Sequence, residues 1–126
     1  MKLLWLTDLH LDRRTKKNHH KLLSRLRGQN ADATVITGDI SEAHQLPDHL
    51  RELGRALAPR PVYFILGNHD FYGSSCSDVD RTVAAVCREQ QNLHHLGQGE
   101  TGPLGHKSAL VGHRGWADGR AGCGSN

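Results

Sequence analysis

Three short motifs in the sequence carry residue types that bind metal ions or transfer protons. They are Asp8-Leu9-His10, Gly38-Asp39 and Gly67-Asn68-His69-Asp70. Their carboxylates, imidazoles and amide oxygen suit manganese, iron or zinc better than a metal that prefers thiolates. The Asp39 carboxylate has two oxygens and could bridge two ions, and two ions about 4 Å apart can clamp a phosphate and activate a water. The motifs therefore indicate a metal site, and two bridged ions there could act on a phosphate group.

The spacing within each motif also suits a metal site. Asp8 and His10 alternate with Leu9, so in an extended chain both side chains would point to the same face. Asp39 follows Gly38, which lets the backbone turn sharply and come close to an ion. Asp and Asn are also ordinary turn residues. Three such motifs, each directly after an apolar segment, nevertheless favour a shared site.

The motifs must be positioned by the apolar segments that precede them, which we expect to be strands. The expected strands cover residues 1–7, 33–37, 62–66, 93–96 and 107–111. Leucine or valine residues at helical spacing predict helices between the strands. The expected helices cover residues 15–27, 46–58 and 77–90.

The alternation of strands and helices predicts an α/β fold with a parallel sheet and right-handed crossovers. Ligands of open parallel sheets bind beyond the carboxyl ends of the strands, so all three motifs are expected at one edge. The first strand is expected to be buried, with Trp5 and Phe64 in the core. Ser77 is expected to cap the third helix, because Asp80 follows three residues later.

The composition predicts one ordinary globular domain, residues 1–126. Hydrophobic residues make up 37% of the chain and charged residues 23%, which excludes a disordered chain, a coiled coil and a collagen. No apolar run is long enough for a membrane span and no signal peptide is evident, so we expect a cytoplasmic protein. The odd number and wide spacing of Cys76, Cys87 and Cys123 argue against a disulfide framework.

Taken together, the three motifs resemble those of the calcineurin-like metallophosphoesterases in order, spacing and position after strands. The resemblance covers the N-terminal half of that fold. It implies the parallel-sheet half of an αββα sandwich, in which two sheets pack together with helices outside. Residues 110–118 are also similar to a bacterial branch of the family, which would place Trp116 and Asp118 at the rim of the pocket.

The resemblance implies two divalent metal ions, with Mn favoured over Fe or Zn. Asp8 and His10 would bind the first ion, Asp39 would bridge both ions, and Asn68 would bind the second. A water activated by the ions would attack the phosphorus of a phosphomonoester or phosphodiester substrate.

The resemblance also implies two catalytic residues. His69 would protonate the leaving oxygen of the substrate or stabilise its charge. Asp70 would hydrogen-bond the far side of the His69 ring and fix its tautomer.

One part of the family pattern is missing from this sequence. The family site includes later histidines that end in a G-H-x-H segment, and no such segment occurs here. His113 follows a glycine, but it does not stand where the family has a ligand. The first ion keeps three ligands and the second keeps two. We therefore expect a truncated domain, with an exposed sheet face or edge through which it could self-associate.

Other interpretations of the sequence stay open. The chain could be a catalytically weak or inactive metal-binding fragment. A nucleotide-binding domain is disfavoured, because no glycine-rich phosphate loop follows a strand. The basic residues between Arg13 and Arg27 could attract a phosphate-rich substrate or a nucleic acid. The wet face of a helix explains them more simply, and no aromatic residues interleave with them. Four paired histidines are expected to be surface or half-buried residues: His19, His20, His94 and His95.

Overall fold

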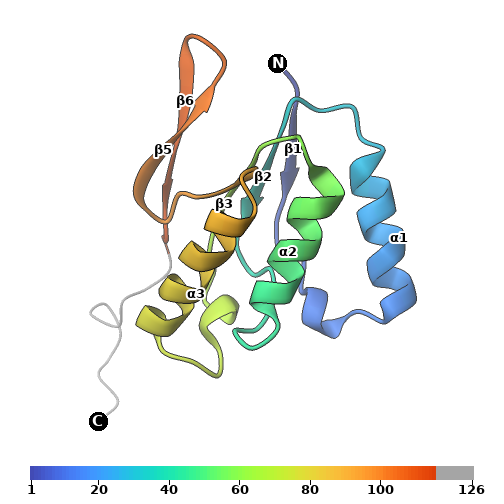
Figure 1. Ribbon diagram of the computed structural model, residues 1–126, viewed down its shortest axis with the longest axis vertical. Coiled ribbons are helices and arrows are strands. Elements are labelled where there is room, and N and C mark those ends of the chain that lie inside the picture. The colour runs from blue at the N-terminus through green and yellow to red at the C-terminus, as the bar shows by residue number, and fades with distance from the viewer. Residues whose placement is uncertain (116–126) are drawn as a thin grey trace.

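A four-stranded parallel sheet forms the centre of the computed structural model, which describes residues 1–115. The sheet order is β1-β2-β3-β4, so each strand pairs with the next one along the chain (Figure 1). The strands are β1 (Leu3–Leu6), β2 (Ala33–Thr37), β3 (Val62–Ile65) and β4 (Leu93–His95). The predicted α/β fold with a parallel sheet is confirmed. The predicted roles of Trp116, Asp118 and Cys123 lie outside the described residues.

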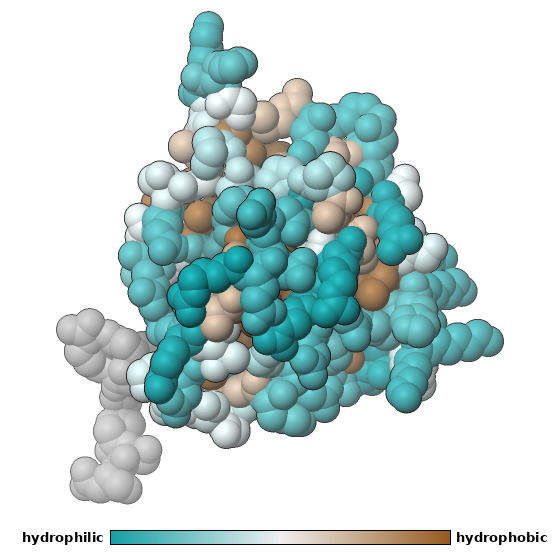
Figure 2. Space-filling view, viewed as in Figure 1, coloured by the Kyte–Doolittle hydropathy of each residue, from teal (hydrophilic) through white to brown (hydrophobic). Residues whose placement is uncertain are grey.

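Three helices connect the strands and cover one face of the sheet (Figure 1). They are α1 (Lys16–Arg27), α2 (Leu46–Leu57) and α3 (Cys76–Glu89). Leu53 of α2 and Val83 of α3 are fully buried in one core with Ile36 and Phe64 of the sheet. The outer side of the helix layer is largely hydrophilic (Figure 2), as expected for the basic residues of α1. None of the described helices combines the length and apolar character needed to cross a membrane.

The N-cap of α3 is Ser75 and not the predicted Ser77. The Ser75 hydroxyl accepts a hydrogen bond from the backbone N–H of Asp78 at 3.1 Å. Asp80 instead pairs with Arg114, at 3.0 Å between carboxylate and guanidinium. The prediction failed because both serines are followed by an aspartate three residues later, so the local pattern fits either position.

A two-stranded antiparallel hairpin, β5 (Gln98–Leu104) and β6 (Ser108–His113), packs on the second face of the sheet. It lies over β3 and β4, where the Tyr63 hydroxyl donates a hydrogen bond to the Pro103 carbonyl at 2.7 Å. The sequence did not predict β5, because its glycines and proline suggested turns. Gly102 is required there by close packing, since a Cβ would lie 2.4 Å from the Tyr63 ring.

The hairpin leaves the part of this second face near β1 exposed. Leu3 is 46% and Trp5 is 71% exposed. The predictions of a buried first strand and of a core position for Trp5 are therefore wrong, whereas Phe64 is buried as predicted. Trp5 pairs with Val35 on the side of the sheet away from the helices. An apolar strand sequence cannot show which of its two faces will be covered.

The paired histidines differ in their burial. His20 and His94 are exposed and His95 is half-buried, as predicted. His19 is buried instead, with its Nε2 in contact with the carboxylate of Glu52 on α2. None of these histidines belongs to the group of described residues that could hold a metal ion.

Candidate metal centre

The loops that follow β1 and β2 run side by side and bring the first two motifs together. The backbone N–H of Asp8 donates to the Gly38 carbonyl at 3.1 Å, and the N–H of His10 donates to the Asp39 carbonyl at 3.1 Å. One ligand atom from each of Asp8, His10 and Asp39 lies within 4.8 Å of the other two. The structure thus places together the three residues predicted to hold the first ion.

These same three residues adopt an unusual backbone conformation. The φ angles of Asp8, His10 and Asp39 are 52°, 42° and 52°, and no other non-glycine residue between 1 and 115 has a positive φ. Such conformations cost free energy and concentrate at functional sites. The expected extended chain at Asp8 and His10 is therefore wrong. Leu9 is nevertheless buried between them, as the alternation suggested.

The chemistry of this group fits a divalent cation. Two carboxylates and one imidazole are ligand types that Mn, Fe and Zn accept, and three protein ligands leave positions open for water or substrate. Asp8 is exposed, and His10 and Asp39 are half-buried, so a small ligand can reach them. The residues present therefore suffice to hold one ion.

The third motif is linked to the group through Asp39. The backbone N–H of His69 donates to Oδ1 of Asp39 at 3.1 Å. The two loops approach so closely that a Cβ on Gly67 would lie 2.1 Å from the same oxygen. The ring centroids of His69 and His10 are 5.1 Å apart. The predicted proton donor therefore lies beside the predicted ligands of the first ion.

Asp70 is completely buried and joins two loops. Its Oδ1 accepts hydrogen bonds from the backbone N–H groups of Ile40 at 2.8 Å and Ser41 at 2.9 Å, and its Oδ2 accepts one from Gly67 at 2.8 Å. Burial raises the pKa of Asp70 to about 6, while the three N–H donors oppose the rise. No hydrogen bond within residues 1–115 joins Asp70 to the His69 ring. In this structure the carboxylate holds the backbone that follows Asp39.

Asn68 is exposed at the start of the short helix η2 (His69–Phe71). Its amide Nδ2 donates a hydrogen bond to the Tyr72 hydroxyl at 3.0 Å. The ring of Tyr72 also packs on His69, with 4.4 Å between the ring centroids. The sequence analysis did not single out Tyr72. Its position two residues after the third motif was the one local signal that could have indicated it.

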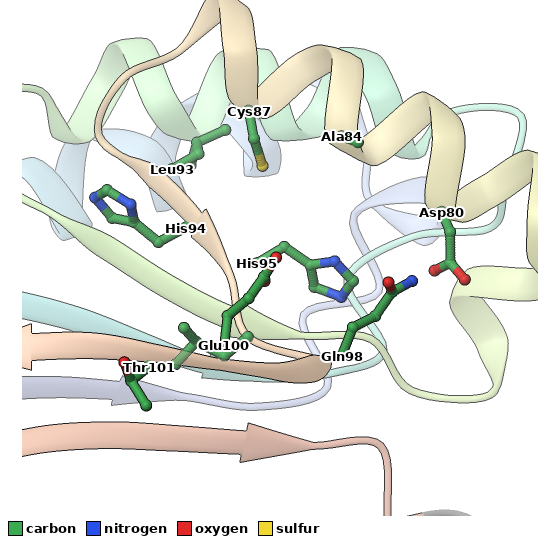
Figure 3. Close-up of a pocket in the computed structure, with 10 residues that line it drawn as sticks. Asp80, Ala84, Cys87, Leu93, His94, His95, Gln98, Glu100 and Thr101 are labelled. Atoms are coloured by element: carbon green, nitrogen blue, oxygen red, sulfur yellow. The ribbon is translucent and has the colours of Figure 1, made fainter.

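A separate cavity of about 350 Å³ lies between α3, β4 and β5 (Figure 3). Asp80 and Cys87 line it from α3, His95 from β4, and Glu100 from β5. None of the residues of the three motifs lines this cavity. Asp80 Oδ1 and His95 Nε2 are buried without a hydrogen-bond partner.

Comparison with known proteins agrees with the geometry. The family profile described as calcineurin-like phosphoesterase matches residues 1–117. A Bos taurus protein named as a transmembrane protein with a metallophosphoesterase domain is 32% identical over 81 residues. That match covers 62% of this chain, which spans 18% of the length of the relative. No solved structure matches the chain significantly. Because the family profile covers nearly the whole sequence, the chain belongs to the calcineurin-like phosphoesterase family.

Proposed function

We propose that this chain is a metal-dependent hydrolase of phosphomonoesters or phosphodiesters that works with two divalent ions, Mn most readily, and a water that they activate. The observation that carries the proposal is the group formed by Asp8, His10 and Asp39 at the carboxyl edge of the sheet. Family membership supplies the reaction class. The strained backbone at all three residues supports a functional origin for the group.

Two sets of residues would hold the ions in this proposal. Asp8, His10 and Asp39 would bind the first ion, and Asp39 and Asn68 would bind the second. When bound, such ions attract phosphate oxygens and lower the pKa of water towards neutrality. Asp39 suits a bridging role because the hydrogen bond from His69 fixes its Oδ1 between the two loops.

His69 is the proposed proton donor to the leaving oxygen. Its backbone N–H donates to Asp39, and its ring contacts the rings of His10 and Tyr72. The side chain is half-buried, so part of the imidazole can meet a substrate. A positioned acid of this kind contributes roughly 100- to 10,000-fold to a rate.

The direct test is hydrolysis of bis-para-nitrophenyl phosphate by the purified chain with added Mn²⁺. Asp39→Asn should remove more activity than Asp8→Asn, because one ligand would serve both ions. We expect the Asp39→Asn loss to exceed the roughly 10- to 100-fold cost of losing an outer-shell partner of a metal ligand. Equal losses in the two variants would contradict the bridging role of Asp39.

The second candidate function is metal binding without turnover. It is favoured by the small ligand set of the second ion, which consists of Asp39 and Asn68. A folded chain that binds Mn²⁺ but hydrolyses no more ester than Asp39→Asn would establish this alternative. Turnover clearly above that variant would exclude it.

A further inference from the structure

Tyr72 contacts two of the proposed site residues at once. Its hydroxyl accepts a hydrogen bond from Nδ2 of Asn68 at 3.0 Å, and its ring packs on His69 with 4.4 Å between centroids. The η2 turn produces this arrangement, because the backbone N–H of Tyr72 donates to the His69 carbonyl at 3.1 Å. The Tyr72 carbonyl also accepts from the backbone N–H of Ala43 at 3.3 Å, which ties the residue to the segment after β2.

The hydrogen bond matters because the two ends of an asparagine amide have opposite chemistry. Oδ1 can accept a hydrogen bond or bind a cation, whereas Nδ2 carries two N–H groups and cannot bind one. Rotation by 180° about the last side-chain bond exchanges the two ends at little steric cost. An exposed asparagine such as Asn68 is therefore better placed to bind a cation when a partner accepts a hydrogen bond from its Nδ2.

We propose that Tyr72 is a positioning residue that holds the amide of Asn68 in its metal-binding orientation. When Nδ2 donates to the Tyr72 hydroxyl, Oδ1 is left free to bind the second ion. The packing of the phenol ring on His69 keeps the hydroxyl in place. This inference rests on the proposed function, in which Asn68 is a ligand of the second ion.

Tyr72→Phe isolates the hydroxyl because it retains the ring and its packing on His69. The side chain is 46% exposed, so the variant should fold normally. Tyr63→Phe is the matched control, since it also removes one tyrosine hydroxyl, here one bonded to the hairpin carbonyl of Pro103. Mn²⁺ binding should be followed by calorimetry and by electron paramagnetic resonance of the bound ions.

We expect Tyr72→Phe to weaken the second Mn²⁺ by roughly 10-fold, the lower range for loss of an outer-shell partner. The first Mn²⁺ should bind as in the wild type, and Tyr63→Phe should bind both ions normally. In the metal-free protein, the side-chain amide resonances of Asn68 should shift in Tyr72→Phe alone. Wild-type affinity for both ions in Tyr72→Phe would overturn the role of Tyr72.

Asn68→Ala separates failure of this inference from failure of the proposed function. If Asn68→Ala loses the second ion and Tyr72→Phe does not, only the role of Tyr72 is refuted. If Asn68→Ala keeps the second ion, Asn68 is not its ligand and both assignments fall. If the wild type binds a single ion, the two-ion function itself is refuted, and the role of Tyr72 with it.

Discussion

Asp39 links the other proposed ligands of the first ion to the loop that carries the third motif. Two glycines allow Asp39 to take up this position. Gly38 has a φ of 96°, a conformation that side chains other than glycine rarely adopt. Gly67 leaves the space that the Asp39 carboxylate occupies. Asp70, from the same loop as Gly67, binds the backbone N–H groups of the two residues after Asp39. At the scale of single residues, the site is therefore held together by contacts between the loops that follow β2 and β3.

Gly67→Ala should displace the Asp39 carboxylate, because the added Cβ would lie 2.1 Å from its Oδ1 and 2.8 Å from its backbone nitrogen. Overpacking of this kind costs about 1–3 kcal/mol of folding stability. We expect Mn²⁺ affinity to fall by at least roughly 10-fold, as for other disturbances around a metal ligand. Calorimetric titration with Mn²⁺ measures this loss.

The matched control for that experiment is Gly28→Ala at the end of α1. A Cβ there would make ordinary contacts, the nearest at 3.6 Å. Gly28→Ala should bind Mn²⁺ as the wild type does. A folded Gly67→Ala protein with wild-type affinity would show that Asp39 can move without consequence.

At the scale of elements, the edge strand β4 carries a half-buried histidine, His95. The ring of His95 stacks on Phe64, with 5.2 Å between centroids, and its Nε2 is buried without a partner. Burial lowers the pKa of His95, and Arg114 lowers it further, while Asp80 and Glu100 oppose the shift. Burial at the edge of the parallel sheet therefore favours the neutral form of this imidazole.

This burial predicts that acid destabilises the fold through His95. Above pH 6.5 the imidazole is neutral in both states and contributes nothing. As the pH falls through 6.5, the unfolded chain binds the proton first, so the free energy of unfolding decreases until the folded pKa is reached. His95→Gln should lose less stability than the wild type between pH 7.5 and 5.5, by at most about 1.4 kcal/mol per pH unit.

Urea denaturation of the metal-free proteins at the two pH values tests this expectation. His94→Gln is the control, because His94 precedes His95 and its side chain is exposed. It should keep the wild-type pH dependence. The expectation fails if His95→Gln and the wild type lose the same stability on acidification.

At the scale of the whole molecule, the two faces of the sheet differ in their cover. The helices bury one face completely enough to form the main core. The hairpin covers only the β3 and β4 side of the other face, and a groove of about 190 Å³ runs between the sheet and β6. Trp5 and Val111 are 71% and 74% exposed on or beside this face. Exposed apolar surface of this kind favours association with another chain.

Trp5→Lys should reduce self-association of the chain if this face is the contact. The cost in stability should be small, about 1 kcal/mol, because Trp5 is mostly exposed and loses one hydrogen bond to Thr37. Sedimentation velocity over a range of concentrations measures the association. His20→Lys adds the same charge on the solvent face of α1 and should behave as the wild type. Association that persists unchanged in Trp5→Lys would place the contact elsewhere.

The sequence by itself determined the order of the four parallel strands and three helices and the position of the three motifs. Both depend on local periodicity and on the general rule that parallel strands end at the same edge. Only the tertiary structure decided whether Trp5 is buried or exposed, which serine caps α3, and which groups Asp70 and Tyr72 contact. The exposure of Trp5 and the partners of Asp70 depend on which surfaces meet across the sheet and between loops. The cap of α3 and the Asn68 contact of Tyr72 are local, but the residue types alone do not select them. Contacts between residues about 30 positions apart, such as Asp70 with Ile40, leave no signature in the neighbouring sequence.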